Sequence, residues 1–146
     1  MSNFTLNSLQ NFIKTVVNKK SMTLKKLNPE EKNIILGIAS LSIPKNQELS
    51  EVAVNEYLLS WLNTEGEMLK IDYIELRRTL IDHQFWIRDK FGTTYLLKDL
   101  DETHPAKIII EHLNAMDIHQ YIQNIKAEYT LESLERKSHF QQLRKV

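Results

Sequence analysis

Apolar residues recur at helical spacing from the start of the chain. In residues 4–20 they occupy one side of a predicted helix, at Leu6, Leu9, Phe12, Ile13, Val16 and Val17. The lysines of this segment lie mostly off that face. We therefore expect a basic amphipathic helical arm whose apolar face packs on the rest of the protein.

Three later segments combine apolar periodicity with signals that start a helix. The first has the clearest signal, because Asn28 is suited to cap a helix, Pro29 suits its first position and Glu31 completes a capping box. Ser50 and Asp72 are predicted to cap the other two. The predicted helices cover residues 29–41, 50–63 and 72–83.

The pattern changes after the third of these helices. Residues 85–88 and 94–97 are rich in aromatic and β-branched side chains, and Gly92 between them suits the turn of a hairpin. Three helices followed by a hairpin are the element order of a winged helix. The predicted fold class is mainly α with a small β-hairpin (α+β), in which a winged-helix-like core carries extra N- and C-terminal helices.

The remainder of the chain returns to a helical pattern. Its apolar stripe changes phase near Met116, where Asp117 and Gln120 are spaced for a capping box. Residues 131–144 have less regular apolar positions and are predicted to form a loosely docked helix or a dimer contact. The change of phase predicts two helices before residue 131, at about 105–116 and 118–129.

No tract rich in glycine, serine or proline separates these segments, and the chain has no internal repeat. We predict one compact unit with three parts. They are a basic helical arm at residues 1–23, a winged-helix-like domain at residues 24–100, and a helical extension packed on that domain at residues 101–146.

Composition narrows the class of protein without pointing to a reaction. The 146 residues carry 19 basic and 19 acidic side chains, so no global field attracts nucleic acid, although residues 1–29 hold five lysines and no acid. The absence of cysteine excludes disulfides and thiolate chemistry and fits a cytoplasmic location. No uncharged run approaches the roughly 20 residues of a membrane span, and Lys14 interrupts the N-terminal apolar stretch. We expect neither a membrane protein nor a secretory signal.

Two segments and the hairpin resemble a known family. Residues 49–55 are similar to its aromatic-Ser/Thr-Glu-x-Glu-Val-Asn segment, residues 76–82 to its Leu-Arg-Arg-x-Leu-Val-Asp segment, and Arg88, Gly92 and Tyr95 fall where its Arg, Gly and Tyr recur. The family is the bacterial domain of unknown function two thousand and eighty-seven, a winged-helix-like module found alone or at the C-terminal end of transcriptional regulators. The resemblance covers roughly residues 24–97 and implies a fold and a regulatory context rather than a reaction.

The candidate binding residues are basic ones that a winged helix would turn toward double-stranded DNA. In such a fold the third helix enters the major groove and basic residues of the hairpin contact the backbone. Arg78 on the third helix and Arg88 and Lys90 at the hairpin are therefore candidate phosphate contacts. Lys19 and Lys20 of the arm would add further ones.

Arg77 is predicted to have a structural role instead. It falls near the middle of the apolar arc of its helix, so we expect a partly buried guanidinium paired with a carboxylate, Glu51 or Asp82. The opposite arc holds Glu75, Thr79 and Asp82, and two carboxylates repel phosphates. The exposed residues of this helix therefore form a poor surface for recognising DNA.

These observations support functions from different classes. The first is a transcription-regulator-like winged-helix protein that binds DNA, or a partner already on DNA, weakly. The alternative is a protein-interaction or dimerisation module, in which the winged helix is only a scaffold and the C-terminal helices bind a regulatory protein or form a homodimer. A third is a small-ligand sensor with a pocket between the hairpin and the C-terminal helices.

No pattern of an enzyme is visible in the sequence. His112 and His119 are seven residues apart, not the four that place two metal ligands side by side on a helix. Neither a glycine-rich phosphate loop nor a nucleophile elbow is present. We expect no catalytic residue, no metal site and no cofactor.

Overall fold

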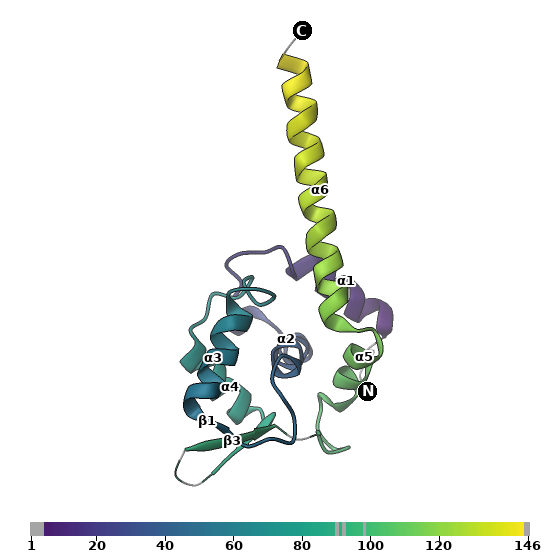
Figure 1. Cartoon of the computed structure of the whole chain (residues 1–146). Helices are drawn as coiled ribbons and strands as arrows, with labels where there is room; N and C mark the ends of the chain where they lie inside the picture. Colours follow the sequence, from purple (N-terminus) through teal and green to yellow (C-terminus); the bar gives the residue numbers. More distant parts are fainter. Residues whose placement is uncertain (1–4, 90, 92, 98, 145–146) are drawn as a thin grey trace.

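The computed structural model describes residues 5–89, 91, 93–97 and 99–144, with side chains as far as Ser138. The described residues form a mainly α-helical protein with a small antiparallel sheet, which confirms the predicted fold class (Figure 1). In chain order the elements are α1 (Leu6–Val16), the 3-10 turn η1 (Leu24–Lys26), α2 (Pro29–Leu41), β1 (Leu49–Ser50), α3 (Glu51–Leu62), α4 (Tyr73–Asp82), β2 (Trp86–Arg88), β3 (Thr94–Leu97), α5 (Lys107–Ala115) and α6 (Ile118–Arg144).

Side-chain caps start three helices where the sequence predicts them. Asn28 Oδ1 accepts a hydrogen bond from the Glu31 N–H at 2.8 Å, and the Glu31 carboxylate accepts one from the Asn28 N–H at 3.0 Å, which completes the capping box of α2. Ser50 accepts at 3.1 Å from an amide in the first turn of α3, and Asp72 does so at 2.7 Å in α4. These bonds satisfy amide groups that a helix leaves without a partner in its first turn.

The sheet has one more strand than the predicted hairpin. β2 and β3 pair antiparallel, with Arg88 opposite Tyr95, which confirms the hairpin. β1 pairs with the other edge of β3, with Leu49 opposite Tyr95, so that the strand order is β1-β3-β2. Because β1 is two residues long and its Ser50 also caps α3, the sequence shows no alternation of polar and apolar residues that would predict a strand there.

Helix α2 forms the centre of the protein. Residues 34–40 are all buried, and in Figure 1 α3 and α4 lie on one side of this helix while α1, α5 and α6 lie on the other. Packing against α5 is close at Gly37, where an added Cβ would lie 3.0 Å from Ile110 and 3.2 Å from Leu113. The helices on both sides therefore share one apolar core, whose removal from water is the main favourable term in folding.

The C-terminal helices differ from the prediction in one respect. The predicted break at Met116 and Asp117 is present, because α5 ends there and Asp117 has a φ of 49°. The separate segments predicted at 118–129 and 131–144 are wrong, since α6 is one continuous helix. Its apolar pattern weakens because α6 packs on the core only as far as Ile125 and then leaves the body, so that no buried face imposes a periodicity (Figure 1).

Candidate functional site

Arg77 joins α3, α4 and the sheet. Its guanidinium lies 3.1 Å from a carboxylate oxygen of Glu51, donates a hydrogen bond to Asn55 Oδ1, and lies over the Tyr95 ring at 5.9 Å from the ring centre. Only 16% of the side chain is exposed. Glu51 is one of the two partners expected for Arg77, and the other, Asp82, lies exposed at the end of α4. We call these four contacting residues, Glu51, Asn55, Arg77 and Tyr95, the Arg77 cluster.

The guanidinium of the Arg77 cluster is already satisfied, because a carboxylate, an amide and an aromatic ring all contact it. Sequence reasoning missed Asn55 and Tyr95 as its partners. The spacing of Glu51 and Asn55, four residues apart and so on the same side of α3, was the available signal for the first. Tyr95 gave no such signal, because only the pairing of the sheet brings it to α4.

The exposed side of α4 is not a basic surface. Arg78 is exposed there, but so are Glu75 and Asp82, three residues before it and four after it, which places both carboxylates beside the guanidinium. Ile74 is also exposed on this helix, to 42%. Its position about 160° around the helix from buried Leu76 accounts for this. The surface of α4 therefore combines two negative charges, one positive charge and an apolar residue.

The hairpin adds one described basic residue beside a strongly apolar edge. Arg88 is exposed on β2, and its pairing opposite Tyr95 puts it on the face of the sheet that the Arg77 guanidinium covers. Ile87 and Phe91 are 55% and 76% exposed. Lys90, the other basic residue expected here, lies outside the described residues.

Asp89 holds the turn of the hairpin. Its carboxylate accepts hydrogen bonds from the Thr93 hydroxyl at 2.6 Å, from the Thr93 N–H at 2.7 Å and from the Thr94 N–H at 3.3 Å. The bond from the Thr93 hydroxyl is the main reason that the pKa of Asp89 lies below its usual value. Desolvation opposes this lowering, and the two backbone amides add to it.

We expect the hairpin turn to loosen in acid. Because the pKa of Asp89 is lowered in the folded state, its contribution to stability is complete above the ordinary pKa of about 4 and is lost as the pH falls through the lowered value. The protection factor of the Thr93 amide in hydrogen exchange should fall over that range. Asp89→Ala should show the low protection already at neutral pH, and unchanged protection in this variant would contradict the role of the carboxylate.

Lys19 and Lys20 lie far from the hairpin. Both are exposed in the segment after α1, which a parallel bridge between Met22 and Leu69 ties to the turn after α3. In Figure 1 this segment and the hairpin are at opposite ends of the body. The structure therefore separates Arg88 on the hairpin from Lys19 and Lys20 at the other end of the body.

Polar contacts fix the first half of α6 to the turn formed by residues 63–70. One ring nitrogen of His119 lies 2.8 Å from a Glu65 carboxylate oxygen, and the other lies 3.2 Å from the Leu41 carbonyl oxygen. Further along, the Lys126 ammonium group donates to a Glu67 carboxylate oxygen at 3.0 Å. Sequence reasoning examined His119 only as a metal ligand and missed this anchoring role, which depends on residues more than 50 positions away.

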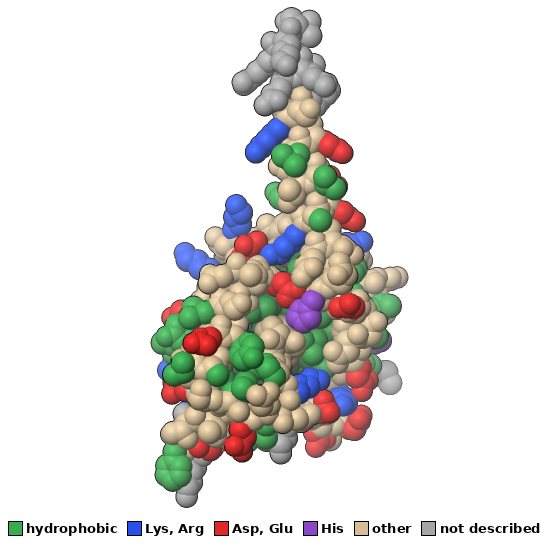
Figure 2. All heavy atoms as spheres, viewed as in Figure 1, with side chains coloured by type: hydrophobic (Ala, Val, Ile, Leu, Met, Phe, Trp, Pro, Cys, Tyr) green, Lys and Arg blue, Asp and Glu red, His purple; other side chains and the backbone are tan. Residues whose placement is uncertain are grey.

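Beyond Lys126, helix α6 projects from the body (Figures 1 and 2). Its 27 residues span about 40 Å at 1.5 Å per residue. As far as Ser138, where the described side chains end, the projecting half exposes the large apolar residues Tyr129, Leu131 and Leu134, to 53%, 60% and 56%. Neither α6 nor any other helix in the described part of the chain is long and apolar enough to cross a membrane.

Within the described residues, no three histidine, aspartate or glutamate side chains are close enough together to hold a metal ion. Three exposed features stand out among the described residues. They are the mixed surface of α4, the apolar edge of the hairpin and the projecting half of α6.

Comparisons with known proteins identify the central part of the chain. No significant match was found among curated proteins or among solved structures. Residues 24–97, which run from η1 to β3 and include the Arg77 cluster, match the family described as "Uncharacterized protein conserved in bacteria (DUF2087)". This match confirms the resemblance carried by the segments at 49–55 and 76–82. The chain therefore belongs to the DUF2087 family of conserved bacterial proteins.

Proposed function

We propose that the protein is a winged-helix module of the transcription-regulator type that acts by binding proteins, in the first place a second copy of itself. The element order α2, β1, α3, α4, β2, β3 supports the winged-helix description, because the short first strand returns to pair with the last strand of the hairpin. The proposal includes a cytoplasmic location, which the absence of cysteine favours, and no enzymatic activity.

Binding to protein is favoured over binding to DNA by the surface of α4. A helix that enters the major groove meets the phosphates of both strands, and α4 would present Glu75 and Asp82 to them. The basic residues at the far end of the body, Lys19 and Lys20, do not extend this surface.

The projecting half of α6 is the observation that carries the proposal. An isolated helix is only marginally stable in water, and one that also exposes Leu131 and Leu134 leaves apolar surface that a partner would cover. Figure 2 shows apolar side chains along this rod, well clear of the body. A helix of this kind commonly pairs with another helix through such positions.

The charge pattern of the rod indicates that the partner is a second copy in antiparallel orientation. Residues 127–135 contain three glutamates, Glu128, Glu132 and Glu135, and no basic residue, whereas the sequence of residues 136–146 contains four lysines and arginines and no acid. Antiparallel pairing brings each acidic half against a basic half. The helix dipole does not explain this pattern, because its effect is confined to the terminal turns and the first turn of α6 holds no acid.

Sedimentation velocity of the intact protein over a range of concentrations tests the proposal. We expect a monomer–dimer equilibrium. Raising the salt from about 0.1 M to about 1 M shortens the Debye length from about 10 Å to about 3 Å and should weaken the dimer. A protein that sediments as a monomer at every concentration would overturn self-association as its function.

A specific observation keeps DNA as a second candidate partner, because Arg78 and Arg88 are both exposed on two elements, α4 and β2, that pack together. If this surface binds duplex, Arg78→Ala with Arg88→Ala should weaken binding equally for all sequences and reduce the salt dependence by about two phosphate contacts. Lys14→Ala with Lys70→Ala removes the same charge from exposed positions outside the surface and serves as the control. Equal losses of DNA affinity in both double variants would exclude this surface as the DNA-binding site.

A further inference from the structure

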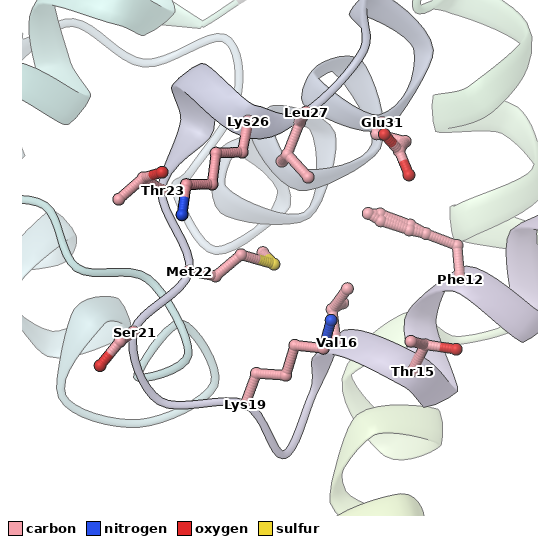
Figure 3. A pocket seen from close by; sticks show the side chains of 10 residues that line it. All are labelled: Phe12, Thr15, Val16, Lys19, Ser21, Met22, Thr23, Lys26, Leu27 and Glu31. Carbon is pink, nitrogen blue, oxygen red and sulfur yellow. The ribbon is translucent and has the colours of Figure 1, made fainter.

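A cavity of about 570 Å³ lies between the end of α1, the segment that follows it, and the first turn of α2 (Figure 3). It is at the end of the body opposite the hairpin (Figure 1). Its volume is in the range of sites that hold small organic molecules, roughly 300–1,000 Å³. Nothing in the proposed dimerisation through α6 uses this cavity.

One side of the cavity is apolar and held in place by the fold. Val16 is buried, while Phe12, Met22 and Leu27 are half-buried, and in Figure 3 the side chain of Met22 points into the space. The Met22 backbone is fixed on both sides, since its N–H donates to the Met68 carbonyl at 2.9 Å and its carbonyl accepts from the Lys70 N–H at 2.8 Å. The apolar wall is therefore formed before any ligand binds.

Positive charge faces this apolar wall. Lys19 and Lys26 line the cavity from different segments, and Figure 3 shows the Lys19 ammonium group beside Val16 and the Lys26 ammonium group beside Thr23. The one carboxylate among the lining residues, Glu31, already accepts the capping hydrogen bond from the Asn28 N–H at 3.0 Å. Two lysines and one carboxylate therefore leave the lining with a net charge of +1.

From this combination we infer that the cavity binds a small amphipathic anion, a molecule with an aliphatic or aromatic body and a carboxylate-like head. The body would replace water against Phe12, Val16 and Met22, and the head would accept charge-assisted hydrogen bonds from Lys19 and Lys26. A neutral molecule of the same shape gains only the first of these contributions.

The test uses decanoate as the anion and decanol as its neutral analogue, with the intact protein. Binding is followed by the NMR shift of the Met22 methyl group and by titration calorimetry. Decanoate should shift the Met22 methyl and bind more tightly than decanol, because hydrogen bonds to charged groups are stronger than those to neutral ones.

Neighbouring lysines supply a matched control. Lys19→Gln with Lys26→Gln removes the two charges that line the cavity, and Lys20→Gln with Lys25→Gln removes the same number from adjacent exposed positions that do not line it. The first pair should lower the affinity for decanoate about tenfold or more and leave decanol unchanged. The second pair should change either affinity less than about twofold.

Three outcomes would overturn the inference. The first is no shift of the Met22 methyl with decanoate, and the second is an equal loss in both double variants, which would mean a diffuse charge effect. The third is binding of the arm to vesicles of anionic phospholipid with no binding of monomeric decanoate, which would make the lysines a membrane contact. All four lysines are exposed, so neither double variant should lower the melting temperature.

Discussion

Leu131→Lys together with Leu134→Lys is expected to turn the proposed dimer into a monomer. Both side chains are more than half exposed on the projecting half of α6 and would be buried only by a partner. Burial of a leucine contributes about 1.5–3 kcal/mol. Four leucines lost per dimer, with new charges in their place, should raise the dissociation constant at least a hundredfold, or about 2.7 kcal/mol. Sedimentation velocity measures this change.

The control introduces two lysines at exposed apolar positions of another helix. Val52 and Leu59 of α3 are 67% and 42% exposed, so Val52→Lys with Leu59→Lys adds the same charge without touching α6. This variant should dimerise as the native protein does. If it loses the dimer and the α6 variant keeps it, the interface is on α3 and the proposed role of α6 is wrong.

Charge exchange tests the antiparallel orientation of the same dimer. A variant in which all seven charges of the rod are reversed exchanges its acidic and basic halves: Glu128→Lys, Glu132→Lys, Glu135→Lys, Arg136→Glu, Lys137→Glu, Arg144→Glu and Lys145→Glu. Two copies of this variant still place opposite charges together when antiparallel, so it should self-associate. It should mix poorly with the native protein, because the acidic half of one would then meet the acidic half of the other. Ready mixing would instead indicate a parallel pair.

Gly66→Ala is expected to destabilise the protein by about 3 kcal/mol or more, near the upper end of the cost of overpacking a core. A Cβ at Gly66 would lie 2.3 Å from the ring of Trp61, closer than a Cβ is found to any non-bonded heavy atom, and that ring is buried. The backbone of Gly66 is also held there, since its N–H donates to the Trp61 carbonyl at 2.7 Å. Urea unfolding followed by tryptophan fluorescence measures the loss.

Gly37→Ala is the matched substitution. Its Cβ would meet the terminal methyl groups of Ile110 and Leu113 at 3.0 and 3.2 Å, a milder overlap that a shift of a few tenths of an ångström relieves, and alanine is favoured over glycine in a helix by about 0.5–1 kcal/mol. We expect a net change near zero. Similar losses at both glycines would show that the Trp61 contact is not what requires glycine at position 66.

The effect of Gly66→Ala should extend beyond Trp61, because the turn at residues 63–70 connects several parts of the protein. Glu65 and Glu67 hold His119 and Lys126 of α6, and the backbone near Leu69 holds Met22 in the cavity wall. Displacement of this turn should therefore weaken the docking of α6 and the cavity together. A shift of the Met22 methyl signal in the variant would report this coupling.

Sequence patterns predicted best the features that arise from residues close together in the chain. The start of α2 was predictable because Asn28 and Glu31 satisfy each other's amide groups within one turn. The burial of Arg77 was predictable from the helical period alone, which set it among the apolar residues of α4. The sequence narrowed its partner to two carboxylates, Glu51 and Asp82, but could not show that it is Glu51, 26 positions earlier.

Prediction failed where the deciding contact comes from a distant residue. β1 exists because β3, more than 40 residues later, offers a free edge to Leu49. The continuity of α6 was hidden because an exposed helix has no buried face to produce an apolar stripe, and the irregular pattern beyond residue 130 was therefore taken for a break. The cavity at Met22 depends on the turn at residues 63–70, so no pattern in the sequence near Met22 predicts it.

The sequence by itself determined the helix starts set by capping, the hairpin and the family. Only the tertiary structure decided that the expected basic residues lie at opposite ends, that Arg77 is held by Asn55 and Tyr95, and that half of α6 projects into solvent. The reason is the separation along the chain of the residues that determine each feature. Caps, turns and helical periods are satisfied within a few residues, whereas the position of a surface depends on which distant apolar faces are buried together.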